Sequence, residues 1–253
     1  MDVDAYLARI GASRPAAPTA EALAELHERH ISTVPFENLS VHLPEPIVLD
    51  EDALADKIVG RRRGGFCYEL NGAFAALLRE LGFEVTLLSA RVFGGDRFGA
   101  PFNHLALRVD LEEPWLADVG FGRFARRPLR LTGCDPQADA EGEFLLLDAP
   151  GGDIDARHGG KPAYRLEQRP RELADFVPTC WWQATSPDSH FTKNLLCTLP
   201  TPGGRVTLAD DQLIETAEGK RVERVLAGAE LVDAYRAYFG IELAEPPTAR
   251  SFT

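Results

Sequence analysis

The residue best placed for chemistry is Cys67, in the segment RRRGGFCYELNGAF (61–74). It follows Gly64 and Gly65, which permit a sharp turn and leave room for a substrate, and it opens an expected helix. A helix N-terminus carries partial positive charge and three arginines (61–63) precede the cysteine, so both effects favour a thiolate. The thiol continues the apolar face of the helix and should point inward. Position alone is equally compatible with a first core residue of a packed helix.

A base and an acid follow, each on its own expected strand. His104 opens FNHLALRVD and Asp118 lies in EEPWLADVGFG, with the turn LEEP between them. If the loop is three residues long (111–113), Asp118 stands opposite Ala106 and diagonal to His104, within side-chain reach. The odd-numbered residues then form an apolar face for the core, and the even-numbered face presents the acid and the imidazole. A loop one residue longer or shorter would break this register.

Together these three side chains could activate a thiol. An ordinary thiol has a pKa of about 8.5 and is mostly protonated at neutral pH, so a neighbouring imidazole must take its proton. A carboxylate fixes the orientation of the ring and stabilises its charged form. A histidine with a purely structural hydrogen bond to a nearby acid would give the same order of residue types. The order Cys, His, Asp alone therefore does not distinguish a catalytic set from a structural one.

The elements that must position these residues change character along the chain. Helices are expected over 2–10, 19–32, 50–59 and 66–81, with 34–46 as an ordered loop or short extended piece. Strands are expected over 85–92, 103–110, 114–119, 144–148 and 164–168. A mixed part follows, with a helical turn at 171–176, strands at 191–199 and 205–209, a helix at 230–239 and an irregular tail.

Bulk properties exclude several classes of function. The chain has 253 residues, 45% of them hydrophobic and 26% charged, which is typical of a globular protein. A formal net charge of −12 argues against general nucleic-acid binding, so an anionic cofactor needs a local cationic cluster. No apolar run is long enough to span a membrane, and the first ten residues do not resemble a signal peptide. We therefore expect a cytoplasmic protein with no membrane partner.

Other residues that could do chemistry carry weaker signals. Four scattered cysteines (67, 134, 180 and 197) favour neither a zinc site nor a disulfide framework. We interpret His27 and His30 as a surface pair rather than metal ligands, because no third ligand is near them in the sequence, and we predict no metal site. Trp181 and Trp182 could line a cleft or belong to the core.

The motifs taken together resemble the arylamine N-acetyltransferases, from near the N-terminus to about Phe239. The segments that carry the resemblance are VPFENLSVHL (34–43), RGGFCYELNGAF (63–74), LGFEV with ARV (81–92), NHLALRV (103–109), WLADVGFG (115–122) and, more weakly, SHFTKNLL (189–196). The combination of RGGFCYELN with NHL and ADVGFG is highly specific to that family.

This resemblance implies an α+β fold related to the papain and transglutaminase arrangement. It implies a helical bundle (1–83) carrying the nucleophile, a central antiparallel β-barrel (84–185) carrying the base and the acid, and an α/β lid (186–253). Family members of bacterial type usually continue with a further C-terminal segment, whereas this chain stops at Thr253. We therefore expect a lid that is short at its C-terminus.

The same resemblance assigns roles to residues. It makes Cys67 the nucleophile, His104 the base and Asp118 the orienting acid, and it implies a structural ion pair between Arg63 and Glu37. The implied reaction is acetyl transfer from acetyl-CoA to the nitrogen of arylamines, hydrazines or N-hydroxyarylamines, in a ping-pong cycle through an acetyl-cysteine. The implied partners are an acyl-CoA and a small-molecule amine, and we expect a monomer or homodimer.

Residues for the two substrates can also be suggested. A flat acceptor favours aromatic walls, for which the candidates are Phe36, Phe121 and Phe191. The loop GFGRFARRP (120–128) could hold the CoA phosphates through Gly120, Gly122, Arg123 and Arg126, beside Arg127, or could be a solvated basic turn. The backbone N–H of Cys67 is a natural donor to an oxyanion at a helix start.

Three rival functions use the same residues. An amide synthase would take a carrier-bound thioester and close a macrolactam, and a thioester hydrolase of the cysteine-peptidase type would let water replace the amine. A catalytically silent module that binds a small molecule or a partner is the non-enzyme alternative, and an intact set of three catalytic residue types argues against it.

Overall fold

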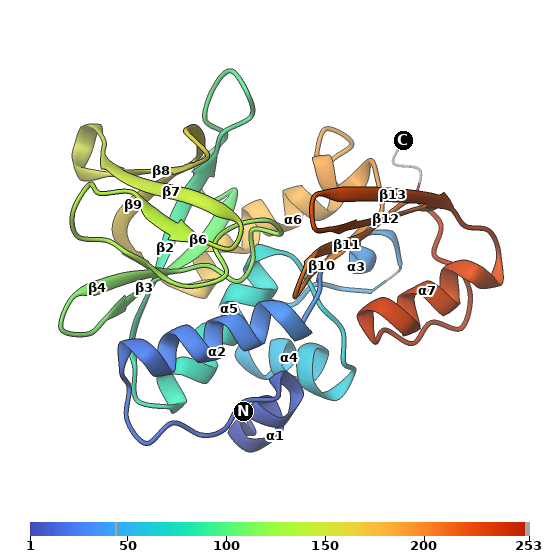
Figure 1. Cartoon of the computed structure of the whole chain (residues 1–253), viewed down its shortest axis with the longest axis horizontal. Coiled ribbons are helices and arrows are strands. Elements are labelled where there is room, and N and C mark those ends of the chain that lie inside the picture. Colours follow the sequence, from blue (N-terminus) through green and yellow to red (C-terminus); the bar gives the residue numbers. More distant parts are fainter. Residues whose placement is uncertain (44, 251–253) are drawn as a thin grey trace.

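The computed structural model describes residues 1–43 and 45–250. Position 44, inside the segment predicted as a loop, and residues 251–253, the end of the predicted lid and tail, lie outside the described residues. Helices gather at the N-terminal end, next to a large strongly curved sheet and a smaller sheet that carries the last helix (Figure 1). This is the α+β architecture that the sequence predicts.

The helices and strands have the following bounds. The helices are α1 (Val3–Ile10), α2 (Ala20–Thr33), α3 (Leu39–His42), α4 (Glu51–Ala55), α5 (Cys67–Glu80), α6 (Val177–Thr185) and α7 (Ala229–Phe239). The strands are β1 (Phe36–Glu37), β2 (Glu84–Val92), β3 (His104–Asp110), β4 (Pro114–Ala117), β5 (Leu129–Arg130), β6 (Gln137–Asp139), β7 (Gly142–Asp148), β8 (Ile154–His158), β9 (Lys161–Arg171), β10 (Leu196–Thr201), β11 (Gly204–Ala209), β12 (Gln212–Ala217) and β13 (Lys220–Val225). Shorter helical turns lie at Asp56–Gly60, Pro150–Gly152, Leu173–Phe176 and His190–Thr192.

Side-chain caps explain where the first helices begin. Asp2 accepts a hydrogen bond from the Ala5 N–H at 3.0 Å, and Thr19 accepts one from the Ala22 N–H at 3.2 Å. Such caps satisfy backbone donors that have no partner inside the helix. Gly11 ends α1 with a φ of 65°, a conformation that glycine adopts without strain. The predicted N-terminal helices are confirmed, apart from the end of the third, which passes into a π-helical turn.

Several expectations from the sequence were wrong. The segment 34–46, predicted as an ordered loop or a short extended piece, contains the two-residue strand β1, which agrees with that prediction, and also helix α3, which does not. The strand predicted at 191–199 begins only at Leu196, because 190–192 form a 3-10 turn. Neither α6 nor the strands β8, β12 and β13 were predicted. β13 is exposed along its whole length and charged, so it lacks the buried alternation that marks a strand in sequence.

The larger sheet is antiparallel and has the strand order β5-β4-β3-β2-β9-β8-β7-β6. Its two edge strands are linked by one side chain, since the Gln137 amide donates to the Arg130 carbonyl at 3.0 Å and accepts from the Arg130 N–H at 2.8 Å. The sheet thereby curls into a nearly closed barrel. β3 pairs with β4 in the register Leu107 opposite Ala117, as a three-residue loop requires.

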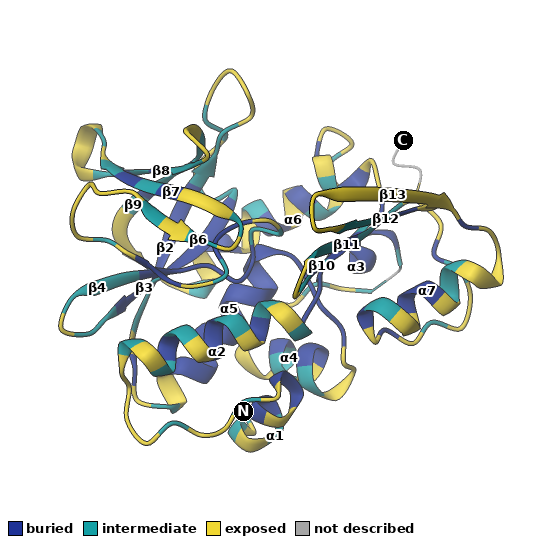
Figure 2. Ribbon diagram, in the orientation of Figure 1, coloured by how far each residue is buried: buried dark blue, intermediate teal, exposed yellow. Residues whose placement is uncertain are grey.

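Helix α5 lies against this sheet and is buried along most of its length (Figure 2). The odd-numbered residues of β3, such as Leu105 and Leu107, belong to the same core cluster as α5, which confirms the predicted apolar face. The even-numbered face is also buried, because Ala106 and Leu116 belong to a second cluster inside the barrel. The acid and the base therefore sit between two hydrophobic cores rather than on a polar face.

The smaller sheet has the order β1-β10-β11-β12-β13, so a strand from the helical N-terminal part forms one of its edges. Phe36 of β1 stands opposite Thr198 of β10, which ties the two parts of the chain together. Helix α7 packs on this sheet through Tyr235 and Phe239. The domain boundaries at 83/84 and 185/186 stay a prediction. Within the described ranges, none of the helices combines the length and apolar character needed to cross a membrane.

Candidate active site

Cys67 is the first residue of α5 and is 3% exposed, so its thiol is directed inward as expected. The two glycines before it are needed for packing rather than for substrate access. A Cβ on Gly64 would lie 1.9 Å from the Pro35 carbonyl oxygen, and one on Gly65 would lie 2.6 Å from a Glu69 carboxylate oxygen. The expectation that these glycines leave room for a substrate was therefore wrong, because protein atoms already fill that space.

Two of the three arginines before Cys67 are paired with carboxylates. Arg63 lies 2.9 Å from the Glu37 carboxylate and 3.1 Å from that of Glu45, and only 7% of its side chain is exposed. Arg61 pairs with Asp56 at 3.1 Å. The Arg63–Glu37 pair agrees with the family resemblance. The positive charge expected beside the thiol is largely neutralised by these partners.

His104 and Asp118 meet as the strand register requires. The His104 Nε2 lies 2.8 Å from Asp118 Oδ2, and both side chains are almost completely buried. With Nε2 engaged, Nδ1 is the ring nitrogen left to act on the Cys67 thiol. Burial lowers the pKa of His104, but the charge and hydrogen bond of Asp118, together with the hydrogen bond to the Cys67 sulfur, outweigh it and raise this pKa to about 10. The site therefore favours an imidazolium.

Asn71, which the sequence analysis overlooked, orients the acid. Its Nδ2 donates to Asp118 Oδ1 at 2.9 Å and to the Leu105 carbonyl at 2.7 Å, while its Oδ1 accepts the Val119 N–H at 2.9 Å. Asn71 follows Cys67 by four residues, so both lie on one face of α5. That spacing was a signal that sequence reasoning could have used.

His27 is also part of the site, and the prediction of a surface pair at His27 and His30 was wrong because both are buried. The His27 Nε2 accepts the Asp118 N–H at 3.1 Å, and its Nδ1 contacts the Arg126 carbonyl at 2.9 Å. These two bonds require a neutral ring with its proton on Nδ1. His30 bonds the Tyr6 hydroxyl at 2.9 Å. Within residues 1–43 and 45–250, no cluster of three potential ligands could hold a metal.

The other three cysteines are placed differently from Cys67. Burial raises the pKa of the Cys180 and Cys197 thiols, which disfavours a thiolate at either position. Cys134 is exposed on the surface. Cys67 is therefore the cysteine that the fold places beside an imidazole.

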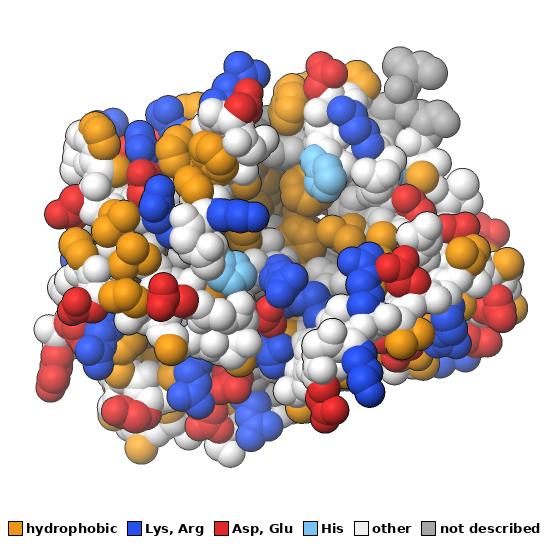
Figure 3. All heavy atoms as spheres, turned by 45° about the horizontal axis from the view of Figure 1, so that its top comes forward, with side chains coloured by type: hydrophobic (Ala, Val, Ile, Leu, Met, Phe, Trp, Pro, Cys, Tyr) orange, Lys and Arg blue, Asp and Glu red, His pale blue; other side chains and the backbone are white. Residues whose placement is uncertain are grey.

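A cavity of about 480 Å³ opens onto Cys67 and His104. It is lined by all three aromatic residues suggested for the acceptor, Phe36, Phe121 and Phe191. The rings of Phe36 and Phe191 are 6.2 Å apart, and that of Phe121 is 5.2 Å from His104. Figure 3 shows the molecule hollowed near the middle of one face, with hydrophobic side chains in the hollow.

Trp181 and Trp182 do not line this cavity. They are 67% and 43% exposed, so neither is a core residue. Trp181 instead borders a separate groove on the other side of α6, together with Val48 and Val177. Both sequence-based alternatives for these tryptophans were wrong.

The glycine–arginine loop after Asp118 is largely engaged by the protein. The Gly120 N–H donates to Asp118 Oδ1 at 3.0 Å, and a Cβ there would lie 2.7 Å from the Cys67 Cα. The Arg126 guanidinium donates to the Thr201 carbonyl at 2.8 Å, among other contacts. Gly120 is therefore required for the approach of this loop to the nucleophile.

Arg126 belongs to a cluster around the buried carboxylate of Glu141. Arg123, Arg126 and Arg205 each bond Glu141, at 3.2, 2.9 and 3.4 Å. The side chain of Arg123 is 69% exposed, whereas Arg126 and Arg205 are mostly buried. Three cations around one anion leave this cluster with a net positive charge in an acidic protein.

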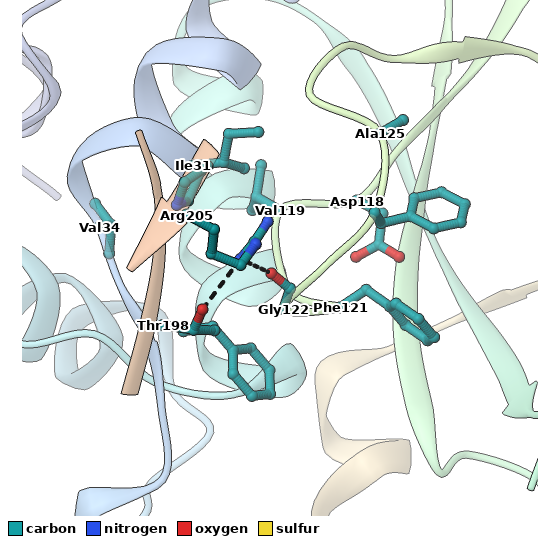
Figure 4. Close-up of a pocket in the computed structure, with 12 residues that line it drawn as sticks. Ile31, Val34, Asp118, Val119, Phe121, Gly122, Ala125, Thr198 and Arg205 are labelled. Atoms are coloured by element: carbon teal, nitrogen blue, oxygen red, sulfur yellow. Dashed lines mark hydrogen bonds between the residues drawn. The ribbon is translucent and has the colours of Figure 1, made fainter. Parts of the chain in front are cut away.

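Arg205 also closes the space behind the acid. From β11 it reaches the Gly122 carbonyl at 2.6 Å and the Thr198 hydroxyl at 3.2 Å (Figure 4). The small pocket there, which Asp118 lines, measures about 20 Å³. It is large enough for about one water molecule and far too small for a substrate. Substrates must therefore enter from the cavity in front of Cys67.

Comparisons with known proteins agree with this geometry. A family model described as N-acetyltransferase matches residues 19–248. The arylamine N-acetyltransferase of Escherichia coli K12 is 39% identical over 227 residues, 87% of this chain and 80% of that protein. The solved enzyme of Salmonella typhimurium superposes with a TM-score of 0.88 at 34% identity, covering 98% of this chain and 94% of the other.

A third relative was solved with a ligand. The Mycobacterium marinum arylamine N-acetyltransferase in complex with CoA gives a TM-score of 0.86 at 32% identity, over 95% of this chain and 93% of that one. The motif residues, the fold and these likenesses lead to one conclusion: the chain belongs to the arylamine N-acetyltransferase family.

Proposed function

We propose that the protein transfers the acetyl group of acetyl-CoA to the nitrogen of an arylamine, hydrazine or N-hydroxyarylamine, with Cys67 as the nucleophile. The observation that carries the proposal is the placement of Cys67 beside His104, itself bonded to Asp118 at 2.8 Å, on a cavity lined by aromatic side chains. The family membership supports acetyl transfer as the general reaction.

In the first half of the proposed cycle, His104 Nδ1 takes the thiol proton and the Cys67 thiolate attacks the thioester carbonyl. The CoA thiolate then leaves and takes the proton back from His104, so that CoA departs as a thiol, the imidazole is neutral again and the acetyl group remains on sulfur. Exchange of one thioester for another is nearly neutral in energy, so this half needs mainly positioning and thiolate activation. The N–H of Cys67, at a helix start, is our candidate donor to the oxyanion.

In the second half, the amine attacks the acetyl-cysteine, an amide forms and Cys67 leaves as a thiolate. The amine proton passes to His104. An alkyl amine with a pKa of about 10.4 is mostly protonated at neutral pH and cannot attack, whereas arylamines and hydrazines are largely neutral. Phe36, Phe121 and Phe191 would hold a flat acceptor against the nucleophile.

For CoA we propose Arg123 and the loop around Gly122 as the phosphate contact. Arg123 is exposed, and the groove beside it has a volume of about 380 Å³ and is also lined by Arg205 and Arg221. The donors of Gly120 and Arg126 are already used within the protein, so these two would support the loop rather than bind phosphate. The M. marinum relative binds CoA. Cytoplasmic location and a monomer or homodimer stay predictions.

The experiment is CoA release from acetyl-CoA, with and without a panel of arylamines and hydrazines, for wild type and Cys67→Ala. Acceptor-dependent release that is lost in the variant is the expected result. Continued release without any acceptor, beyond the one CoA per enzyme that formation of the acetyl-cysteine frees, would instead indicate a thioester hydrolase. No release, despite preferential alkylation of Cys67 by iodoacetamide, would refute acetyl-CoA as the donor and direct the search to carrier-bound thioesters and amide synthesis.

A further inference from the structure

The cavity in front of Cys67 has an unusual balance of polar groups. Its described lining includes no Asp, Glu, Lys or Arg. Besides Cys67 and His104, the polar side chains that line it are Asn103, Gln183 and His190. Apart from the imidazole of His104, which is already bonded to Asp118, a charged substituent on a substrate would therefore find no ion-pair partner there, and hydrogen bonds must fix the orientation of a bound molecule.

Gln183, on helix α6, is 8% exposed and presents a fixed amide to this cavity. Its Oε1 accepts the Ser189 hydroxyl at 2.8 Å, and the Ser189 oxygen in turn accepts the Phe191 N–H at 3.2 Å. The serine hydroxyl thus accepts one hydrogen bond and donates another, to the glutamine carbonyl. The Gln183 amide thus keeps its oxygen toward Ser189 and leaves its NH₂ group available.

That NH₂ group has no acceptor within the part of the chain that the structure describes. Nor is its nitrogen among the fully buried polar atoms without a partner, so it keeps some solvent access, and the side chain that carries it lines the cavity. Asn103 has the same arrangement, since its Oδ1 accepts the Val92 N–H at 2.9 Å. Both carboxamides have their oxygens engaged by the protein and their NH₂ groups unused, so what the cavity still offers is hydrogen-bond donors.

We propose that Gln183 determines acceptor specificity by donating a hydrogen bond from Nε2 to a carbonyl or carboxylate oxygen on the amine substrate. The preferred substrates are then arylamines and hydrazides that carry such an oxygen, and the same compounds without it are disfavoured. The proposal rests on the proposed function, because it concerns the second substrate of that reaction.

The position of the amide explains why the acceptor is its partner. The turn 189–191 that orients Gln183 also carries Phe191, one of the aromatic walls of the cavity. A flat ring held by the phenylalanines, with its amine at Cys67, therefore has an edge available to the glutamine. A site built to bond a substrate oxygen rejects analogues that lack it, because the donor is then left unpaired in a desolvated cavity.

The test compares three acceptors in the wild type and in Gln183→Leu: 4-aminobenzoate, 4-aminobenzamide and 4-methylaniline. The acetylated enzyme is formed first, and kcat/KM for its reaction with each amine is measured. Each compound is compared with itself in the wild type, so differences in intrinsic reactivity cancel. Gln183→Leu should lower kcat/KM about tenfold for the two oxygen-bearing amines and leave 4-methylaniline within about twofold.

Two further variants sharpen the result. Gln183→Glu replaces the donor with a carboxylate of the same shape, and should lower the rate for 4-aminobenzoate more than for 4-methylaniline. Gln212→Leu, at an exposed position on β12, is the matched control and should change nothing. An equal loss of kcat/KM with all three amines would overturn the proposal. So would a loss confined to the rate of CoA release in the first half, because the Gln183 amide would then contact the acyl donor instead of the amine.

A binding measurement separates this proposal from the proposed function. If the wild type acetylates none of these amines, the proposed function fails, and the unreactive analogues 4-methylbenzoate and toluene still test Gln183. Protection of Cys67 from iodoacetamide should require about tenfold more 4-methylbenzoate in Gln183→Leu, with no change for toluene. Equal protection of the two proteins by 4-methylbenzoate would refute the role of the amide.

Discussion

Asp118, which orients His104, is itself fixed by four hydrogen bonds within the protein. It receives hydrogen bonds from His104, from Asn71 and from the Gly120 N–H, and its own N–H donates to His27. Burial alone would raise the pKa of this carboxyl, but the positive charge of His104 and these bonds lower it. A buried carboxylate that stays ionised can keep the imidazole charged and oriented.

His27→Phe should therefore reduce activity as well as stability. The substitution leaves the Asp118 N–H and the Arg126 carbonyl without partners in a buried place, at a cost of about 2–4 kcal/mol in the free energy of unfolding. The displaced carboxylate should lower kcat by about tenfold or more with little change in KM. Urea unfolding and steady-state kinetics measure the two effects. An unchanged kcat in a folded variant would show that His27 does not help to position Asp118.

The protonation of His27 gives an independent check. Burial lowers its pKa below the usual 6.5, so the folded protein holds the neutral ring while the unfolded chain takes up a proton. The wild type must therefore lose stability as the pH falls below 6.5. His27→Gln, which cannot titrate, should lose less between pH 7 and pH 5, as followed by Tm. Parallel curves would contradict this assignment.

A second residue-scale prediction concerns the ion pair under the first turn of α5. Lys57 Nζ lies 2.6 Å from Glu69 Oε1, and Glu69 Oε2 accepts the Phe66 N–H at 3.2 Å. Both charged side chains are at most 5% exposed. Lys57→Met leaves a buried carboxylate without its cation and should cost about 3–5 kcal/mol. The double variant Lys57→Met/Glu69→Gln, which keeps an acceptor for the Phe66 N–H, should recover much of this loss in the free energy of unfolding, as measured in urea. If the losses of the two single variants simply add in the double variant, the two side chains do not stabilise each other.

At the scale of elements, the part of the site that could be predicted is the part set by local sequence. The alternation of β3 and the three-residue loop before β4 place Asp118 next to His104, and the structure has that register. Helix α5 was predictable because its apolar residues recur on one face. These features need only neighbouring residues. Helix α6, which carries Gln183, was missed because two exposed tryptophans and a proline blur its pattern.

The contact between α5 and the loop after β4 leads to a prediction at Gly120. A Cβ there would lie 2.7 Å from both the Cys67 Cα and the Asn71 Nδ2. Gly120→Ala must push the loop away from the nucleophile, and a displacement of about 1 Å lowers rates about a hundredfold. Gly203→Ala is the matched control, since its Cβ would meet nothing within 4 Å. Near-normal kcat/KM in Gly120→Ala would show that the approach is not needed.

At the scale of the whole molecule, the feature that sequence could not reveal is the junction between the two sheets. Arg126 follows the β4 loop, yet its guanidinium donates to the carbonyls of Thr201 and Gly204 in the smaller sheet. Its own carbonyl contacts His27, which accepts the Asp118 N–H. The bonded residues lie up to 99 positions apart in the chain, and no periodicity or spacing connects them. Arg126 was predicted as a phosphate contact because, in sequence, an arginine in a glycine loop that binds phosphate cannot be told from one that bonds other parts of the protein.

Glu141 allows this junction to be tested through its pH dependence. Burial raises the pKa of this carboxyl, but Arg205, Arg126 and Arg123 outweigh it and lower the pKa below the usual 4.5. The ionised group therefore stabilises the fold above pH 4.5, and the contribution is lost as the pH falls through the lowered pKa. Glu141→Gln should cost about 2–3 kcal/mol at pH 7, because three arginines lose a largely buried anion.

The difference between wild type and Glu141→Gln should then shrink in urea unfolding at pH 4 and below, while the exposed Glu143→Gln changes little at either pH. A difference that stays constant from pH 7 to pH 3 would mean that the carboxylate charge does not hold the two sheets together. If the cost at pH 7 is accompanied by a lower kcat, the junction also positions Asp118 through Arg126 and His27. If stability falls and kcat does not, the junction and the acid are independent.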